Sequence, residues 1–477
     1  MPATWGIAFG SETSTTQALF EENYRLRFKK ISLARSPLEI FSKLYTHNEN
    51  AYLLESIEGP KKLAQYSFIG FDPTLTVQIK NGEAVTRNET TGEESREKTS
   101  DPLLIIKKLV KGTVHNKEHR FVGGAVGYIS YDAVRYWEKL PKMTSDDLNF
   151  PDVQLGVFDD GIVFDHRQKR AFYYYSSDNR LAEVERLLRQ SSDCEALSYK
   201  QPKVNVTKEY FEKAVEKAKE YVASGDIFQV VLSKRYEFRV EGDLIEFYRS
   251  LREINPSPYM YFLKAGDRQI VGSSPEMLVR VDNRRVETFP IAGTRPCVRE
   301  NSENRRLAKE LLADPKERAE HVMLVDLARN DVGKISKFGS VRVPEFMKVH
   351  RYSHVQHIVS QVVGDLKEDC ECYDALRAVF PAGTVSGAPK VRAMEIIEEL
   401  ESSRRGPYAG AVGYFSYNGN ADFAITIRTL FADRDKAYIQ AGAGIVADSV
   451  PEREWFETEQ KAGALMKALQ MSGGETA

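Results

Sequence analysis

Apolar side chains recur at helical spacing in the middle of the chain, and a longer apolar run follows them. The recurring positions lie three or four residues apart: Phe211, Val215, Ala218 and Val222. Thr207 precedes them as a good N-cap and Gly225 follows as a common helix end, so a helix is predicted over residues 207–225. The next segment, residues 227–240, predicts a long strand.

Two polar stretches interrupt the apolar pattern. Residues 87–101 contain no apolar side chain, which is typical of a solvated hairpin tip or loop. A second polar stretch, residues 190–205, follows the amphipathic segment 181–188 and comes just before the predicted helix. We therefore predict a boundary there, between an N-terminal lobe of residues 1–200 and a C-terminal domain of residues 201–477.

One octapeptide occurs twice in the chain. Gly-Ala-Val-Gly-Tyr-Ile-Ser-Tyr at residues 124–131 returns at residues 410–417 with Phe415 in place of Ile129. Both copies predict strands bent at a glycine. Two interpretations stay open, namely two unrelated strands of similar composition or an old repetition between two lobes.

Helix and strand patterns are mixed along the 477 residues, without the strict alternation that a parallel sheet requires. This mixture predicts an α+β fold. We expect large antiparallel β-sheets packed in a sandwich, helices on the outer faces, and two lobes.

The composition narrows the classes of function. Hydrophobic residues make up 42% and charged residues 29% of the chain, as in an ordinary globular enzyme. The 67 basic and 69 acidic side chains give a net charge of −2 without a long block of one sign. Neither nucleic acid nor a membrane surface is therefore an expected partner, which leaves small molecules and other proteins.

Targeting and cysteine patterns point to a cytoplasmic protein. No apolar run approaches the ~20 residues of a membrane-spanning helix, and residues 1–9 have neither a basic segment nor a sustained apolar one. The four cysteines are too few for a disulfide scaffold, and they include no Cys-x-x-Cys pair that would indicate zinc.

Two glutamate pairs follow predicted helix starts. Glu317 and Glu320 follow Asp314-Pro315 in the sequence, and Glu454 and Glu457 follow Val450-Pro451. The members of each pair share a helix face, and Lys461 shares that of the second pair. Each pair alone is typical of a solvated helix surface. If the helices face each other, carboxylates about 4 Å apart would repel by ~4 kcal/mol and require a cation, for which all-oxygen ligation favours Mg²⁺.

A glycine-rich loop, residues 381–389, leads into a helix whose predicted first residue is Pro389. Backbone N–H groups at such a helix start, with the hydroxyls of Thr384 and Ser386, can bind an anion. The spacing is not that of a Walker loop, so a carboxylate is as good a candidate as a phosphate. A plain structural turn is the alternative.

Three single residues carry further chemistry. His357 lies in a predicted half-buried strand, where a histidine is either a hydrogen-bonded core residue or a group for proton transfer. Glu276 lies at a predicted strand start. Arg428 is a cation inside a predicted apolar strand, where it requires a carboxylate partner from the protein or a ligand.

Taken together, these segments resemble the chorismate-utilising enzyme family, and most closely its anthranilate synthase branch. Residues 226–469 carry the resemblance densely, and residues 53–56 and 66–70 carry it more thinly. The dense motifs are Asp-Ile-Phe-Gln-Val-Val-Leu-Ser-Lys-Arg at 226–235, Pro-Ile-Ala-Gly-Thr-Arg-Pro at 290–296, Glu-His-Val-Met-Leu-Val-Asp-Leu-Ala-Arg-Asn-Asp at 320–331, the loop 381–390, and Gly-Ala-Gly-Ile-Val at 442–446 with Glu454 and Glu457.

The resemblance implies roles for these residues. Glu320 and Glu457, aided by Glu317 and Glu454, would bind the Mg²⁺ that holds the ring carboxylate of chorismate. Glu276 would protonate the departing C4 hydroxyl while ammonia adds at C2, and His357 would serve the elimination of pyruvate. The residues expected around the substrate are Gly293, Thr294, Gly383, Thr384, Tyr408, Arg428, Gly442, Ala443, Gly444 and Lys461.

Two positions distinguish the branches of the family. Related enzymes that add water have a lysine where Gln229 stands, and a glutamine cannot deprotonate water, so an amine nucleophile is favoured. Aminodeoxychorismate synthases often have a lysine in place of Ala292, so the alanine favours anthranilate. The aminodeoxychorismate branch stays open, as does a catalytically inactive tryptophan-sensing scaffold subunit.

The ammonia source is expected in another chain. No cysteine has the glycine neighbour that the nucleophile elbow of a glutamine amidotransferase requires, so we expect a separate glutaminase subunit as partner. The resemblance also implies a feedback site for tryptophan between the lobes. Its residues would be Leu54, Glu55, Ser56, Asn255, Pro256, Tyr259 and Met260.

Overall fold

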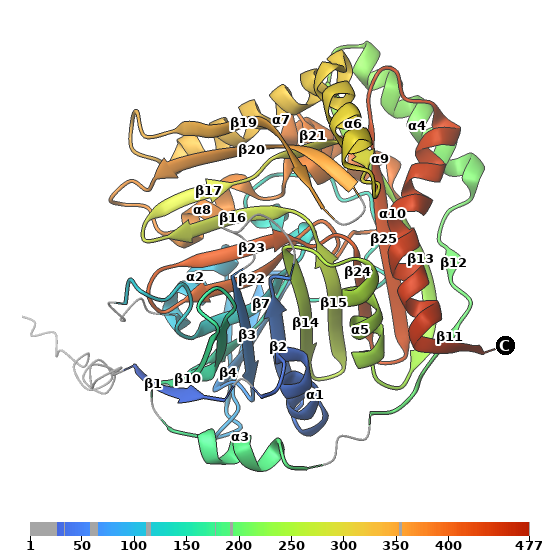
Figure 1. The fold of residues 1–477 in the computed structure, drawn as a ribbon. Helices are drawn as coiled ribbons and strands as arrows, with labels where there is room; N and C mark the ends of the chain where they lie inside the picture. Colours follow the sequence, from blue (N-terminus) through green and yellow to red (C-terminus); the bar gives the residue numbers. More distant parts are fainter. Residues whose placement is uncertain are drawn as a thin grey trace, which may run out of the picture.

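Two large β-sheets form the centre of the molecule, and helices cover their outer surfaces (Figure 1). This computed structural model describes residues 26–32, 34–57, 65–110, 116–176, 178–190, 194–352 and 355–476; residues 1–9, considered above for targeting, lie outside this part. The predicted α+β fold with large antiparallel sheets is confirmed. Among the described residues, no helix is both long and apolar enough to cross a membrane.

The first sheet has fourteen strands in the described part of the chain. Its order is β1-β10-β9-β3-β2-β14-β15-β24-β25-β13-β11-β26, with β12 and β21 paired to β13, and its β11–β26 pair is parallel. The strands are β1 (Arg27–Ile31), β2 (Asn50–Glu55), β3 (Tyr66–Phe71), β9 (Asp160–Asp165), β10 (Arg170–Tyr175), β11 (Leu197–Lys200), β12 (Lys203–Val204), β13 (Gln229–Glu241), β14 (Tyr259–Ala265), β15 (Arg268–Ser274), β21 (Gly387–Ala388), β24 (Thr429–Asp433), β25 (Lys436–Ile445) and β26 (Gly473–Thr476).

The second sheet has twelve strands among the described residues. Its order is β18-β20-β17-β16-β23-β22-β7-β8-β4-β5-β6, with β19 paired to β20. The strands are β4 (Leu75–Lys80), β5 (Glu83–Asn88), β6 (Glu94–Lys98), β7 (Gly124–Ile129), β8 (Val153–Phe158), β16 (Met277–Asp282), β17 (Arg285–Thr288), β18 (Ile291–Pro296), β19 (Arg342–Arg351), β20 (Val355–Asp365), β22 (Ala411–Ser416) and β23 (Ala421–Ile425). The polar stretch 87–101 lies mostly in the exposed hairpin β5–β6, as predicted.

The helices pack on the two sheets from outside, with α5 and α10 side by side on the first sheet (Figure 1). They are α1 (Pro37–His47), α2 (Pro102–Leu109), α3 (Leu181–Leu187), α4 (Lys208–Ala223), α5 (Ile245–Ile254), α6 (Asn301–Ala313), α7 (Pro315–Ile335), α8 (Cys372–Val379), α9 (Lys390–Leu400) and α10 (Pro451–Ser472), with the 3₁₀ helices η1 (Tyr131–Tyr136) and η2 (Gly383–Val385). The predicted helix behind Thr207 is α4, and the Thr207 side chain accepts a hydrogen bond from Tyr210 N.

The two copies of the repeated octapeptide are neighbours in the second sheet. β7 and β22 pair antiparallel, and Gly127 lies opposite Gly413. Each glycine allows another strand to approach closely, because a Cβ atom would lie 2.1 Å from Gln154 O at Gly127 and 2.0 Å from Asp422 O at Gly413. The similarity between the copies therefore extends from sequence to surroundings.

Both sheets combine strands from before and after residue 200. β2 pairs with β14 in the first sheet, and β7 pairs with β22 in the second. The predicted division at residue 200 stays a prediction, and it separates two segments that share both sheets.

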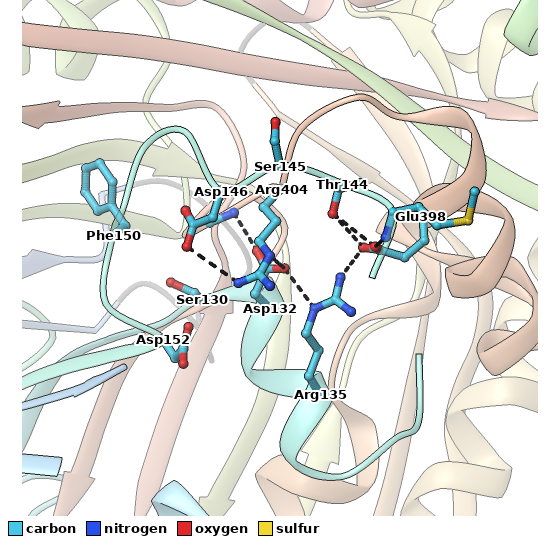
Figure 2. Close-up of polar contacts among 12 residues, drawn as sticks. Ser130, Asp132, Arg135, Thr144, Ser145, Asp146, Phe150, Asp152, Glu398 and Arg404 are labelled. Atoms are coloured by element: carbon cyan, nitrogen blue, oxygen red, sulfur yellow. Dashed lines mark hydrogen bonds and ion pairs between the residues drawn. The ribbon is translucent and has the colours of Figure 1, made fainter. Parts of the chain in front are cut away.

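A network of ion pairs joins η1 to the end of α9 (Figure 2). Arg135 lies between two buried carboxylates, those of Asp132 and Glu398. Arg404 extends the network to Asp146, with 3.5 Å between Nη1 and Oδ2. These pairs tie residues 130–152 to the connection between α9 and β22, which leads toward the candidate site.

Candidate active site

The floor of the candidate site is the end of β25. β24 pairs with β25 only as far as Ile439, whereas β13 pairs with β25 as far as Ile445. In the part of the chain that the structure describes, residues 440–445 therefore have a strand on one side and an open edge on the other. Backbone groups on an open edge have no ladder partner and can receive a ligand.

Two glycines on this floor make room for polar side chains. A Cβ atom at Gly444 would lie 2.5 Å from Gln229 Nε2, and one at Gly442 would lie 2.8 Å from the Tyr408 hydroxyl oxygen. Alternation along the strand turns Ala443 to the opposite face, where it belongs to the core with α4 and α9. The predicted substrate contact of Ala443 is therefore confined to its backbone.

Glu320 is linked to the floor of the site by a hydrogen bond to Gln229, which lies against Gly444. α7 begins behind Asp314, whose Oδ1 accepts hydrogen bonds from the backbone N–H groups of Lys316 at 3.0 Å and Glu317 at 3.3 Å. In the second turn of α7, Glu320 Oε1 accepts a hydrogen bond from Gln229 Nε2 at 3.0 Å. Burial raises the pKa of Glu320, the Gln229 hydrogen bond opposes this rise, and the charge of Glu317 adds to it.

Glu317 is held by Arg295 of β18. Arg295 Nη1 donates to Glu317 Oε1 at 3.0 Å, and Nη2 donates to Asp314 Oδ2 at 3.1 Å. Gly293 lies against the same carboxylate, because a Cβ atom there would be 2.9 Å from Glu317 Oε2. Gly293 has a φ of 63°, which glycine adopts without strain.

The second glutamate pair lies on α10, which begins at Pro451 as predicted. Lys461 Nζ lies 2.8 Å from Glu457 Oε1 and donates to Gly442 O at 2.9 Å. Glu454 is buried, and burial raises its pKa with a further rise from the charge of Glu457. α10 therefore meets the floor of the site through Lys461.

The two glutamate pairs lie within electrostatic range of each other. The charge of Lys461 on α10 acts to lower the pKa of Glu320 on α7, and that of Lys316 on α7 acts to lower the pKa of Glu454 on α10. Within the described ranges, however, no three His, Cys, Asp or Glu side chains lie close enough to hold a metal ion. Both pairs border one site without forming a ligand cluster.

Glu276 lies between β15 and β16, and only 8% of it is exposed. Burial raises its pKa to about 8, against the opposing effects of the Thr384 hydroxyl and the charges of Arg428 and Lys461. The carboxyl group is therefore mostly protonated at neutral pH. Glu276, Gly383 and Thr384 line a cavity of about 50 Å³ beside α7.

The prediction that Arg428 lies inside a strand is wrong. Arg428 lies in the turn between β23 and β24 with a φ of 50°, and an apolar sequence pattern does not reveal a left-handed residue. Burial lowers the pKa of its guanidinium. Among the described residues the guanidinium makes neither an ion pair nor a hydrogen bond, so it is free to bind a carboxylate ligand.

His357 lies on β20 and contacts β18. Its Nδ1 is 2.9 Å from Gly293 O and 3.1 Å from Thr294 Oγ1. Because a carbonyl oxygen only accepts, we assign the hydrogen to Nδ1, which leaves Nε2 as a proton acceptor. Burial lowers the pKa of His357 to about 4, so the imidazole is neutral at pH 7.

The loop 381–389 runs between α7 and β13. Gly383 fits against α7, where a Cβ atom would lie 2.2 Å from Leu327 Cδ2. Ser386 donates its hydroxyl to Ala382 O at 2.8 Å, whereas Thr384 faces Glu276. Pro389 is the N-cap of α9, so the prediction of Pro389 as first helical residue is wrong by one position.

The residues of the implied tryptophan site converge where β2 ends and β14 begins. Met260 pairs with Glu55, and Tyr261 pairs with Leu54. The Ser56 hydroxyl donates to Pro258 O at 2.7 Å.

The remaining residues of this set lie in and after the turn between α5 and β14, which contains Asn255 and Pro256. Asn255 Nδ2 donates to Ser273 Oγ at 3.2 Å, and the Tyr259 hydroxyl donates to Asp422 Oδ1 at 2.9 Å. The structure thus brings the set together and gives its polar groups protein partners.

Sequence reasoning missed three cations at the site, namely Arg295, Lys316 and Arg405. Arg405 is buried and donates to Val385 O at 2.6 Å and to Val231 O at 2.7 Å, so it fixes the loop to β13. Arg295 belongs to the 290–296 motif, and a search for the cation balancing the first glutamate pair would have found it. Arg405 gave no signal, because Ser-Arg-Arg-Gly is typical of an exposed turn.

Comparison with known proteins gives three related findings. The family model for chorismate binding enzyme matches residues 49–467. Anthranilate synthase component 1 of Methanothermobacter thermautotrophicus is 49% identical over 92% of this chain and 93% of its own, and aminodeoxychorismate synthase component 1 of Bacillus subtilis is 44% identical over 94% and 98%. The crystal structure of anthranilate synthase component I from Streptococcus pneumoniae TIGR4 superposes with a TM-score of 0.75 at 39% identity, covering 86% of this chain and 93% of that one.

Proposed function

The chain belongs to the chorismate binding enzyme family, and on this premise we propose that it converts chorismate and ammonia into anthranilate, pyruvate and water. The observation that carries the proposal is a buried, protonated carboxyl group, Glu276, within electrostatic range of Arg428 beside an open strand edge; in the part of the chain that the structure describes, the Arg428 guanidinium has no ion-pair or hydrogen-bond partner. Relatives named anthranilate synthase component 1 support the choice of product.

Substrate binding rests on cations and open backbone groups. Chorismate carries two carboxylates, and Arg428 and Lys461 are the cations that act on Glu276. We propose that Arg428 binds one carboxylate of the substrate, because a guanidinium holds a carboxylate with two parallel hydrogen bonds. The open edge of β25 around Gly442 offers further backbone groups to the substrate.

Glu276 is the proposed general acid. Hydroxide is a poor leaving group, so the C4 hydroxyl has to be protonated as ammonia adds at C2. A carboxyl group with a pKa of about 8 holds its proton at neutral pH and can donate it in this step.

Gln229 favours ammonia over water as nucleophile. Its Nε2 donates to Glu320, and its neutral amide has no basic site with which to activate water. Ammonia needs no such activation, because neutral ammonia is a much stronger nucleophile than neutral water.

His357 is the proposed base in the second step. Pyruvate leaves as the C2 proton is lost, and the ring becomes aromatic. A neutral imidazole with its hydrogen on Nδ1 offers Nε2 as the proton acceptor, and Gly293 O fixes this tautomer.

The two glutamate pairs offer carboxylate oxygens, which are the kind of ligand that Mg²⁺ prefers. Burial raises the pKa values of Glu320 and Glu454, and the other glutamate of each pair, Glu317 or Glu457, adds to the rise by repulsion. A divalent cation bound by Glu320 and Glu457, with Glu317 and Glu454, would relieve this repulsion and neutralise the ring carboxylate of the substrate.

We further propose a glutaminase partner subunit and feedback inhibition by tryptophan. The word component in the names of the relatives supports a partner chain. The tryptophan site is proposed at Leu54, Glu55 and Ser56 together with residues 255–260, which adjoin across β2 and β14.

The aminodeoxychorismate reaction is a second candidate, favoured by the 44% identical relative of that name. Ala292 argues against it, because this residue of β18 supplies no nucleophile. A catalytically inactive scaffold subunit is the third candidate, and the presence of both glutamate pairs and Lys461 argues against that role.

One assay separates the three candidates. The purified chain is incubated with chorismate, Mg²⁺ and ammonium, and anthranilate is followed by its fluorescence. Anthranilate supports the proposal, a 4-amino product supports the second candidate, and no product supports the scaffold. Glutamine in place of ammonium should give no product until a glutaminase is added.

Tryptophan inhibition is tested by titration of the wild type and Ser56→Arg. The larger arginine side chain should abolish inhibition by tryptophan, while the rate without tryptophan should stay unchanged. Equal inhibition of both proteins would contradict the assignment of the site.

A further inference from the structure

Lys234 of β13 is a buried lysine with no assigned role. Its side chain has an exposed fraction of 0%, and three aromatic rings from three elements surround its ammonium group. Nζ lies 2.9 Å from the ring centroid of Trp455 on α10, 5.7 Å from that of Tyr236 on β13 and 5.9 Å from that of Phe211 on α4. Aromatic faces stabilise a desolvated cation.

The polar partners of this ammonium group also lie on α10. Nζ is 3.4 Å from Trp455 O and 3.5 Å from Glu459 Oε1. Burial lowers the pKa of Lys234 to about 8, and Glu459 opposes this effect. A buried ammonium is costly unless its partners stay in place, so the position of α10 and the charge on Lys234 depend on each other.

Two lysines therefore tie α10 to two neighbouring strands of the first sheet. Lys234 extends from β13 to the first turns of α10, and Lys461 extends from α10 to Gly442 O on β25. Glu454 and Glu457 flank Trp455 within the same two turns of the helix. Any movement of Trp455 along the helix axis would move both glutamates.

We propose that Lys234 is a positioning residue that fixes α10 so that Glu454 and Glu457 face the substrate. This inference rests on the proposed function, since it concerns the glutamates of the same site. Lys234 touches neither glutamate and acts through Trp455 and Glu459. Removing a residue that supports metal ligands without touching the metal typically lowers metal affinity 10- to 100-fold.

The test compares Lys234→Met, which keeps the length and removes the charge, with Lys234→Arg, which keeps the charge. Lys467→Met removes an exposed lysine from the same helix and is the control. We expect Lys234→Met to raise the Mg²⁺ concentration for half-maximal rate at least 10-fold. Lys234→Arg should stay within about 3-fold of the wild type and Lys467→Met should equal it, because a guanidinium also stacks on an aromatic ring.

Trp455 provides a readout that needs no substrate. The titratable groups facing Lys234 are Glu459 of α10 and Tyr236 of β13, while α4 contributes the Phe211 ring. When Lys234 loses its charge, the fluorescence emission of the Trp455 indole should change, between pH 6 and 10, with a midpoint near pH 8. This change should be absent from Lys234→Met and from Trp455→Phe.

Three outcomes would overturn the proposal: wild-type Mg²⁺ dependence in Lys234→Met, equal impairment in Lys234→Met and Lys234→Arg, or no emission change that depends on Lys234. If Lys234→Met does not fold, Glu459→Gln replaces it, and an unchanged Mg²⁺ dependence there overturns the proposal equally. A wild type without Mg²⁺-dependent product formation would instead refute the proposed function, and the emission titration would still decide the role of Lys234.

Discussion

At the scale of single residues, burial separates the glutamates of the site into two kinds. Glu276 is enclosed and protonated at neutral pH, whereas Glu457 is exposed and paired with Lys461. The first kind can donate a proton, and the second can bind a cation. The same side chain therefore serves two purposes, decided by its surroundings.

Glu276→Gln should lower the turnover number by ~10²- to 10⁴-fold, because the amide keeps the shape of the side chain and cannot protonate the leaving hydroxyl. The Michaelis constant for chorismate should change little. Steady-state anthranilate fluorescence measures both. Turnover within 10-fold of the wild type would assign the acid to another group.

Glu276→Gln should also stabilise the protein in alkaline solution. The folded-state pKa of about 8 lies above the ordinary value of 4.5, so the wild type loses unfolding free energy as the pH rises between these values, by up to about 1.4 kcal/mol per pH unit. The variant lacks this loss. Urea unfolding from pH 5 to 9 should show a difference that grows until about pH 8 and then levels off; a constant difference would refute the raised pKa.

Single residues were the least predictable level from sequence. Glu276, His357 and Arg428 could be selected as chemically unusual, but their surroundings come from strands that are distant in sequence. The left-handed turn at Arg428 follows from the β23–β24 connection, which no apolar pattern encodes. The inward face of Gly442 and Gly444, and the outward face of Ala443, depend on strand parity, which the motif alone does not fix.

At the scale of elements, helix starts control the placement of the glutamates. Asp314 caps α7, and Glu317 lies in its first turn. The start of α7 is encoded locally by a capping side chain and a proline, and that of α10 by a proline alone, so both starts could be predicted from sequence. Whether the two helices approach one site is a tertiary property, which the spacing within each pair cannot reveal.

Asp314→Ala should cost about 1 kcal/mol of unfolding free energy, because two backbone N–H groups of α7 lose their acceptor. It should also raise the Mg²⁺ concentration for half-maximal rate, since Glu317 lies in the loosened turn. Asp326→Ala on the same helix removes only an exposed pair with Arg329 and should cost less than ~0.5 kcal/mol. Equal effects of the two substitutions in urea unfolding and Mg²⁺ titration would contradict the capping role.

At the scale of the whole molecule, the two sheets connect both ends of the sequence. Strands β2 and β7 pair with β14 and β22, so the sheets of the C-terminal segment are completed by strands from the N-terminal segment. The fold class could be predicted from the mixed periodicity. The shared sheets could not, because the composition shift near residue 200 marks a connection and carries no information on pairing.

A fragment of residues 201–477 should therefore not fold alone, since β14 and β22 would each lose a neighbouring strand. We expect it to aggregate, and co-expression with residues 1–200 should recover soluble complex and activity. Circular dichroism and size-exclusion chromatography measure both results. A monomeric fragment that melts cooperatively would show that the predicted domain boundary is also a folding boundary.

The pairing of β7 with β22 also constrains how the protein is made. During translation, the edge of β7 that will meet residues 411–416 stays unpaired until most of the chain has left the ribosome. Such long-range pairing is slow, and the waiting apolar strand is exposed to other nascent chains. The yield of active protein in the cell should therefore depend on chaperones that shield the N-terminal third until the C-terminal strands arrive.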